Sequence, residues 1–135
     1  MIRQVVYIKH YWKVIIYYNI DYDLFKYAEK DLISIGITEQ AIRRMLRRLK
    51  NKAKAVTVSN LGNHISVVIF NKHSNPYDYI NSIVHEAEHI KQAMLKAYNV
   101  EDEGEPPAYT IGYLVMRMLY PTNLSQIERT YYRQI

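Results

Sequence analysis

Two histidines and a glutamate in the second half of the chain have the types and the spacing of a metal site. Residues 85 to 89 read His85-Glu86-Ala87-Glu88-His89, a His-Glu-x-x-His pentad. On an α-helix, two residues four positions apart lie on one face, so both imidazoles can bind the same metal ion. Glu86 reaches the rim of that site, where zinc proteases use a carboxylate to take a proton from metal-bound water. The pentad therefore indicates a metal site with a carboxylate beside it. The alternative is a polar helix face with two solvent-exposed histidines and a solvated acidic loop after the helix.

A zinc ion that keeps an open position needs a third protein ligand. The chain has no cysteine, so this ligand must be an imidazole or a carboxylate. Glu105 is the strongest candidate, because it enters the first turn of the last predicted helix, 16 residues after the pentad. Glu105, Tyr109, Gly112 and Met116 recur at helical spacing. We expect Gly112 to allow a close approach to the pentad helix and Tyr109 to direct its hydroxyl at the metal-bound water or at a substrate carbonyl.

The helix that carries the pentad is predicted to run from Pro76 to about Tyr98, with Asn75 as its N-cap. Its histidines are expected to lie opposite the apolar face, toward a groove or a second packing element. That apolar face is expected to contain Ile80, Ile83, Val84, Ala87, Ile90 and Met94.

The remaining patterns predict a small α+β protein with one domain over residues 1–135. Strands are predicted at residues 5–8 and 12–20, and a β-hairpin at 56–59 and 65–70. Helices are predicted over residues 24–33, capped by Asp21 or Asp23, after Thr38, and from Pro106 to about Leu119, where Pro121 ends the last one. Residues 122–135 form an extra helix or a loose tail in this interpretation. We expect a small antiparallel sheet packed on three or four helices.

The pentad with a downstream glutamate on a helix resembles the zincin metallopeptidases, specifically the gluzincin branch. Residues 56–114 are also similar to small phage or mobile-element proteins of Bacteroidetes-type bacteria. Those proteins have a short β-hairpin, a helix with the pentad, and a later Gly-Glu followed by Ala-Tyr and Gly. Here the later part reads Gly-Glu-Pro-Pro-Ala-Tyr-Thr-Ile-Gly over residues 104–112.

This resemblance implies a zinc metallopeptidase that acts on a peptide or protein substrate. It implies His85, His89 and Glu105 as Zn²⁺ ligands and Glu86 as the general base. In zincins an edge strand beside the site holds the substrate in extended form, and residues 65–70 are expected to be that strand.

Two features depart from the larger gluzincins. The chain has no second lobe to form the far wall of a cleft. No clear partner orients the histidines, and Asn81, Glu88 or a backbone carbonyl is expected to do so. Of the other histidines, His10, His64 and His73 are expected in loops or strands rather than as ligands.

The formal net charge of +5 comes from one segment of the chain. Between residues 41 and 54 lie seven Lys and Arg residues and no acid: Arg43, Arg44, Arg47, Arg48, Lys50, Lys52 and Lys54. Such a run contacts phosphates in nucleic-acid-binding proteins. Its spacing around Met45, Leu46 and Leu49 equally fits an amphipathic helix with a solvated face, which we favour because no DNA-binding motif accompanies it. The alternative function is a non-catalytic, metal-stabilised module of a phage or mobile element that contacts nucleic acid or protein through this helix.

No apolar run is long enough to span a membrane, and the apolar stretch at residues 5–8 is too short for a signal sequence. The absence of cysteine excludes disulfides and thiolate metal sites. We therefore expect a cytoplasmic location.

Overall fold

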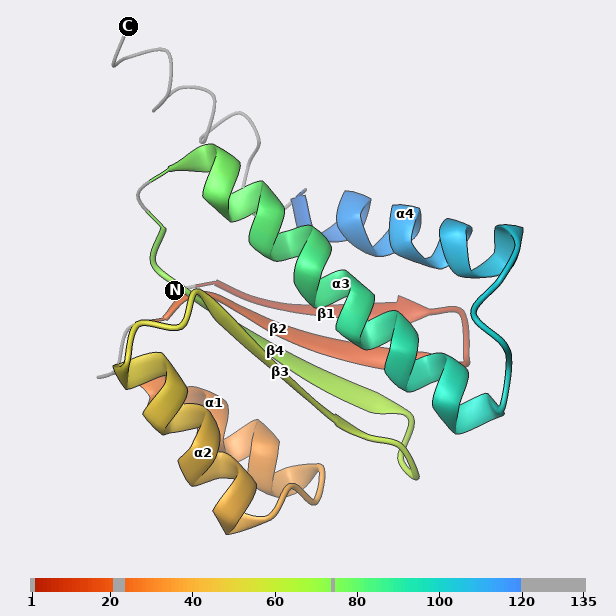
Figure 1. The fold of residues 1–135 in the computed structure, drawn as a ribbon. Coiled ribbons are helices and arrows are strands. Elements are labelled where there is room, and N and C mark those ends of the chain that lie inside the picture. Colours follow the sequence, from red (N-terminus) through yellow and green to blue (C-terminus); the bar gives the residue numbers. More distant parts are fainter. Residues whose placement is uncertain (1, 21–23, 74, 120–135) are drawn as a thin grey trace, which may run out of the picture.

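The computed structural model describes residues 2–20, 24–73 and 75–119. It confirms the α+β class (Figure 1). Its elements are β1 (Ile2–Ile8), β2 (Trp12–Ile20), α1 (Phe25–Ser34), α2 (Glu39–Lys50), β3 (Ala55–Asn60), β4 (Ile65–Asn71), α3 (Pro76–Tyr98) and α4 (Glu105–Leu119). The predicted caps Asp21 and Asp23, the helix stop at Pro121 and the tail at 122–135 lie outside the described residues. No helix within the described ranges is long and apolar enough to cross a membrane.

The four strands form one mixed sheet in the order β1-β2-β4-β3. The pairs β1–β2 and β3–β4 are antiparallel, as expected. The central pair β2–β4 is parallel, so the expectation of an entirely antiparallel sheet is wrong there. The chain leaves β2, forms α1 and α2, and returns through β3 before β4 takes its place beside β2. Both central strands are buried on both faces, which explains their nearly continuous apolar sequences.

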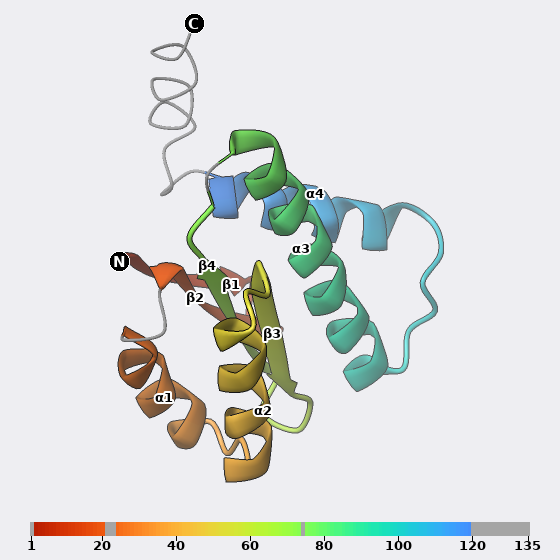
Figure 2. The same cartoon turned by 60° about the vertical axis from the view of Figure 1, so that its left-hand side comes forward.

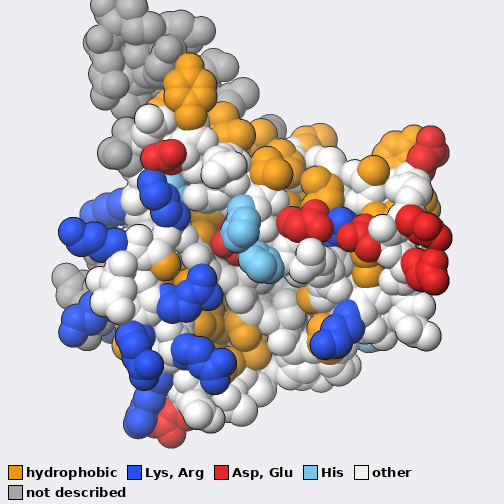
Figure 3. Space-filling model, viewed as in Figure 1, with side chains coloured by type: hydrophobic (Ala, Val, Ile, Leu, Met, Phe, Trp, Pro, Cys, Tyr) orange, Lys and Arg blue, Asp and Glu red, His pale blue; other side chains and the backbone are white. Residues whose placement is uncertain are grey.

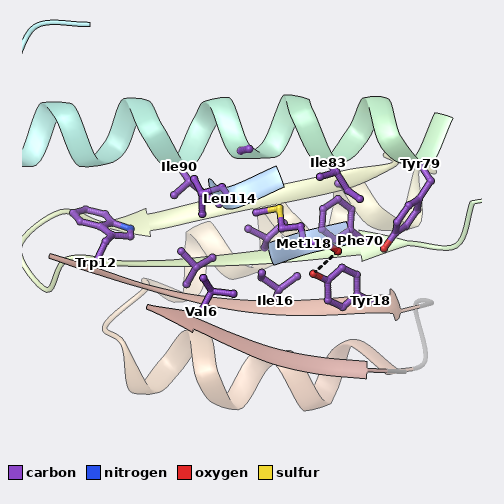
Figure 4. Close-up of a cluster of buried hydrophobic side chains, with 14 residues drawn as sticks. Val6, Trp12, Ile16, Tyr18, Phe70, Tyr79, Ile83, Ile90, Leu114 and Met118 are labelled. Atoms are coloured by element: carbon purple, nitrogen blue, oxygen red, sulfur yellow. Dashed lines mark hydrogen bonds between the residues drawn. The ribbon is translucent and has the colours of Figure 1, made fainter. Parts of the chain in front are cut away.

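The sheet separates two pairs of helices, with α1 and α2 on one face and α3 and α4 on the other (Figures 1 and 2). Residues alternate between the two faces along each strand. In β2, Ile16 and Tyr18 pack with the α3–α4 side, whereas Ile15 and Tyr17 pack with the α1–α2 side. Figure 4 shows the first of these clusters, in which side chains of α3 and α4 meet the central strands.

Local capping signals fix where two of the helices begin. Thr38 Oγ1 accepts a hydrogen bond from the Ala41 N–H at the start of α2. Asn75 Oδ1 accepts from the Tyr77 and Asp78 N–H groups at the start of α3, where Pro76 occupies the first helical position. Both helix starts agree with the sequence-based predictions.

The buried face of α3 is only partly the one that the apolar spacing predicted. Ile83, Ala87 and Ile90 are fully buried, as expected. Val84, however, is 43% exposed, and Glu86 is buried in its place. The buried face is thus displaced around the helix axis toward Glu86, because α3 packs on the edge of the sheet as well as on α4.

Candidate functional site

The two histidines of the pentad lie on the exposed side of α3 and point toward one another. Their Nε2 atoms are 3.2 Å apart, and their ring centroids are 4.7 Å apart with the planes nearly perpendicular. An ion about 2.05 Å from both nitrogens would join them at an angle of about 103°, close to the tetrahedral value of about 109°. His85 and His89 are therefore spaced to chelate one ion without a change in the helix.

The carboxyl group of Glu86 lies beneath α3, against the sheet. The residue is only 4% exposed, and Thr57 Oγ1 of β3 donates a 2.5 Å hydrogen bond to Glu86 Oε2. Glu86 was expected at the rim of the site, and Thr57 was not among the expected site residues. The alternation in β3 does carry the signal, because Thr57 pairs with Val68, which belongs to the α3 side of the sheet.

A groove of about 360 Å³ runs beside α3 and includes His85 and Glu86. One wall is α3, and the other is the end of α2 with the start of β3. The other lining residues are Arg48, Ala53, Lys54, Ala55, Asp78, Asn81 and Ser82. Lys54 Nζ pairs with Asp78 Oδ2 at 2.9 Å between the walls, and this hydrogen bond lowers the pKa of Asp78. The groove thus contains one imidazole of the pair, that of His85, and the covered carboxyl group of Glu86.

The strand beside this groove is β3, and not the expected strand at residues 65–70. β4 lies between β2 and β3, so both of its edges carry strand partners. β3 pairs only with β4 among the described residues, which leaves its other edge open toward the groove. The hairpin pattern predicts that β3 and β4 pair, but not which of them lies at the edge of the sheet, because that depends on contacts with distant parts of the chain.

The structure does not bring the third expected ligand to the histidines. Across the described ranges, no three His, Cys, Asp or Glu side chains are placed to hold a metal ion. α3 continues for nine residues past His89, or about 14 Å, before the chain turns, and the exposed Glu105 begins α4 beyond that turn. The role of Glu105 as a ligand stays a prediction that requires a different placement of this loop.

The helix face that was expected to meet α3 points outward instead. A Cβ atom added to Gly112 would have no neighbouring atom within 4 Å, so this residue makes no close helix contact. Tyr109 is 71% exposed and lines a different hollow, with Ile8 and Tyr11. The reason is that α4 buries Leu114 and Met118. These residues lie on the opposite side of the helix from Gly112 and Met116, so the face that contains Gly112 is turned outward.

Lys91, a buried lysine that no sequence motif indicated, connects α3 to the acidic segment that follows it, which reads Glu-Asp-Glu-Gly-Glu over residues 101–105. Lys91 Nζ is 2.8 Å from both Glu88 Oε1 and Asp102 Oδ2, and these two contacts, Asp102 first, raise the pKa of Lys91. Glu88 also accepts a hydrogen bond from Gln92. Glu88 is thus engaged with Lys91 and Gln92 rather than orienting a histidine, and no hydrogen bond links Asn81 to the histidines in the described part of the chain.

His73 and His64 lie outside the helices and strands and contact other parts of the fold. His73 Nδ1 faces the Asn71 carbonyl at 2.8 Å and therefore carries a hydrogen, while Nε2 accepts from Ser82 Oγ at 2.9 Å. Burial lowers the pKa of His73 and favours this neutral form. His64 stacks on Trp12 at 5.5 Å between centroids.

The basic segment forms an amphipathic helix and the turn after it. α2 buries Ile42, Met45 and Leu49 and exposes its arginines. Arg43 pairs with Glu39 at 2.6 Å. Figure 3 shows Lys and Arg gathered over α2, Asp and Glu gathered over the α3–α4 loop, and histidine side chains between them.

Comparison of the chain with models of protein families, with curated proteins and with solved structures finds no match in any of the three.

Proposed function

We propose that this protein is a zinc-dependent peptide hydrolase in which His85 and His89 hold the metal ion and Glu86 accepts the proton. The proposal requires a third ligand, for which Glu105 stays the candidate once its loop takes a different placement. The separation of 3.2 Å between the two Nε2 atoms carries this proposal, because it matches the distance between two ligands of one tetrahedral ion. In the metal-free pair one Nε2–H donates to the other nitrogen, and an ion would replace that hydrogen. Bound zinc supplies Lewis acidity, which makes water a nucleophile at neutral pH and polarises a carbonyl group.

Glu86 has the surroundings that suit proton transfer. It lines the same groove as His85, and its burial holds the carboxyl group away from bulk water. Thr57 occupies Oε2, while Oε1 forms no hydrogen bond with the described residues. Oε1 is therefore the atom that accepts a proton from water and returns it to the leaving amine.

The open edge of β3 suits an extended peptide. An unpaired strand edge offers alternating N–H and C=O groups, and a peptide that pairs with it becomes an additional strand. β3 carries Thr57 and begins at Ala55, which lines the groove. A peptide bound along β3 would thus pass the Glu86 carboxyl group and His85, the histidine that lines the groove.

The metal site is tested by zinc titration of the purified protein in competition with a chromophoric chelator. Structural zinc contributes roughly 10–16 kcal/mol over four ligands, or about 2.5–4 kcal/mol for each. His85→Ala and His89→Ala should each weaken binding by roughly 100-fold to 1,000-fold. His10→Ala, an exposed histidine outside the site, is the matched control and should bind as the unmodified protein does. Equal affinities for all four proteins would refute the site.

Catalysis is tested separately from metal binding. Glu86→Gln should keep the zinc affinity within about threefold while it removes hydrolysis of a casein or mixed-peptide substrate. Full activity of Glu86→Gln in a protease-free preparation would exclude the proposed proton acceptor.

A second function has one observation in its favour. Arg44, Arg47 and Arg48 are exposed and make no ion pair within the described residues, so α2 offers charge to a nucleic acid. A non-catalytic module that binds through α2 would show a salt-dependent shift of duplex DNA, abolished by reversal of these charges. It would also bind no hydroxamate inhibitor, whereas an open zinc site would.

A further inference from the structure

One cation in the groove has no ion-pair partner among the described residues. The lining of the groove contains Arg48 and Lys54 on one wall and Asp78 and Glu86 on the other. Lys54 forms an ion pair with Asp78, and Glu86 accepts a hydrogen bond from the Thr57 hydroxyl group. The side chain of Arg48 is exposed and forms neither a hydrogen bond nor an ion pair with any other described residue.

The backbone around Arg48 is held in place by buried contacts. Leu49, the next residue, is buried in the core between α2 and the sheet. The Ala53 N–H donates to the Arg48 carbonyl at 2.9 Å, and Asn71 Nδ2 donates to the carbonyls of Leu49 and Ala53. Arg48 therefore lines the groove from a backbone that is held in place.

We propose that Arg48 forms a specificity subsite for an acidic side chain of a peptide bound along β3, an inference that rests on the proposed peptide hydrolase. A guanidinium group binds a carboxylate through two parallel hydrogen bonds, which gives direction as well as charge. In an extended peptide, every second side chain points to the same side, so a residue on that side can face Arg48 while the backbone pairs with β3. The substrate class is a peptide with an Asp or Glu near the cleaved bond.

The same groove disfavours a nucleic-acid strand. A strand places a negative charge at every nucleotide, and counterion release on Lys and Arg provides most of its binding energy. Asp78 and Glu86 would face those phosphates, and Lys54 would have to leave Asp78. A peptide needs only one carboxylate, which matches the one unpaired guanidinium in the lining that the structure describes.

Binding is measured by amide chemical shifts of the ¹⁵N-labelled full chain. The probes are three ten-residue peptides of Ser and Thr with a central Glu, Gln or Lys. We expect the Glu peptide to shift amides of residues 53–57 and 82–86 and to bind roughly threefold to tenfold more tightly than the Gln peptide. Arg48→Glu should reverse the order, so that the Lys peptide binds more tightly than the Glu peptide. Arg44→Glu changes the charge of the same helix equally but lies outside the groove lining, and should keep the original order.

The outcomes separate this subsite from the metal site. The measurements are made without metal and repeated in the double variant His85→Ala, His89→Ala, where the preference for Glu should persist because Arg48 forms no hydrogen bond with the histidines. Equal binding of the Glu and Gln peptides, an equal effect of Arg48→Glu and Arg44→Glu, or tighter binding of duplex DNA to the groove amides would each overturn the subsite. Loss of zinc binding alone would contradict only the hydrolase.

Discussion

Replacing Thr57 by Val tests whether the sheet fixes the position of the Glu86 carboxyl group. Val has the shape of Thr but no hydroxyl, so Oε2 of a residue that is 4% exposed loses its 2.5 Å hydrogen bond. A buried acceptor left without a donor costs about 1–3 kcal/mol, and more where the group is charged. We expect the free energy of unfolding, measured in urea at neutral pH, to fall by about this amount with an unchanged m-value.

Thr57→Ser is the matched control, because it keeps the hydroxyl and removes one half-buried methyl group, at about 0.8 kcal/mol or less. A double-mutant cycle with Glu86→Ala isolates the contact, since Thr57→Val should cost much less once the carboxyl group is gone. If Thr57→Val were as stable as the unmodified protein, or equally destabilising with and without Glu86, water would satisfy the carboxyl group and Thr57 would not position it.

Three further predictions concern other parts of the fold. For Asp31, burial opposes ionisation, but the hydrogen bonds from Arg3 and Tyr17 outweigh it and lower the pKa below 3.8. The stability that this carboxylate adds is therefore fully present well above pH 3.8 and is lost as the pH falls through the lowered pKa. The stability difference between the unmodified protein and Arg3→Ala should be constant above about pH 5 and shrink toward about pH 2. A difference that stays constant over that range would contradict this. An NMR titration of His73 should give a pKa below 6.5, because burial disfavours its charged form, and a value at or above 6.5 would exclude the buried neutral ring. Gly36→Ala should lower the unfolding free energy by about 1–2 kcal/mol, because Gly36 has φ +85° in the turn after α1, and a melting curve without change would show that the turn adopts another conformation.

Local patterns in the sequence determined where the helices and strands lie and that His85 and His89 share one helix face. The Asn75–Pro76 signal began α3 at the correct residue, and Thr38 began α2. The four-residue spacing placed His85 and His89 on one face, because helical geometry alone decides that relation. Their position away from the core also followed from the apolar residues Ile83, Ala87 and Ile90.

Tertiary packing decided how these elements face each other. Whether Glu86 or Val84 is buried depends on a rotation of α3 by part of a turn, and the sheet edge at Thr57 set that rotation. The parallel β2–β4 pair and the open edge of β3 depend on where the crossover through α1 and α2 returns. Because α4 buries Leu114, its opposite face points outward. Because α2 buries Leu49, the neighbouring Arg48 lies beside the groove. These relations join residues far apart in the chain, whereas helical and strand periodicity reports only which residues of one element share a face.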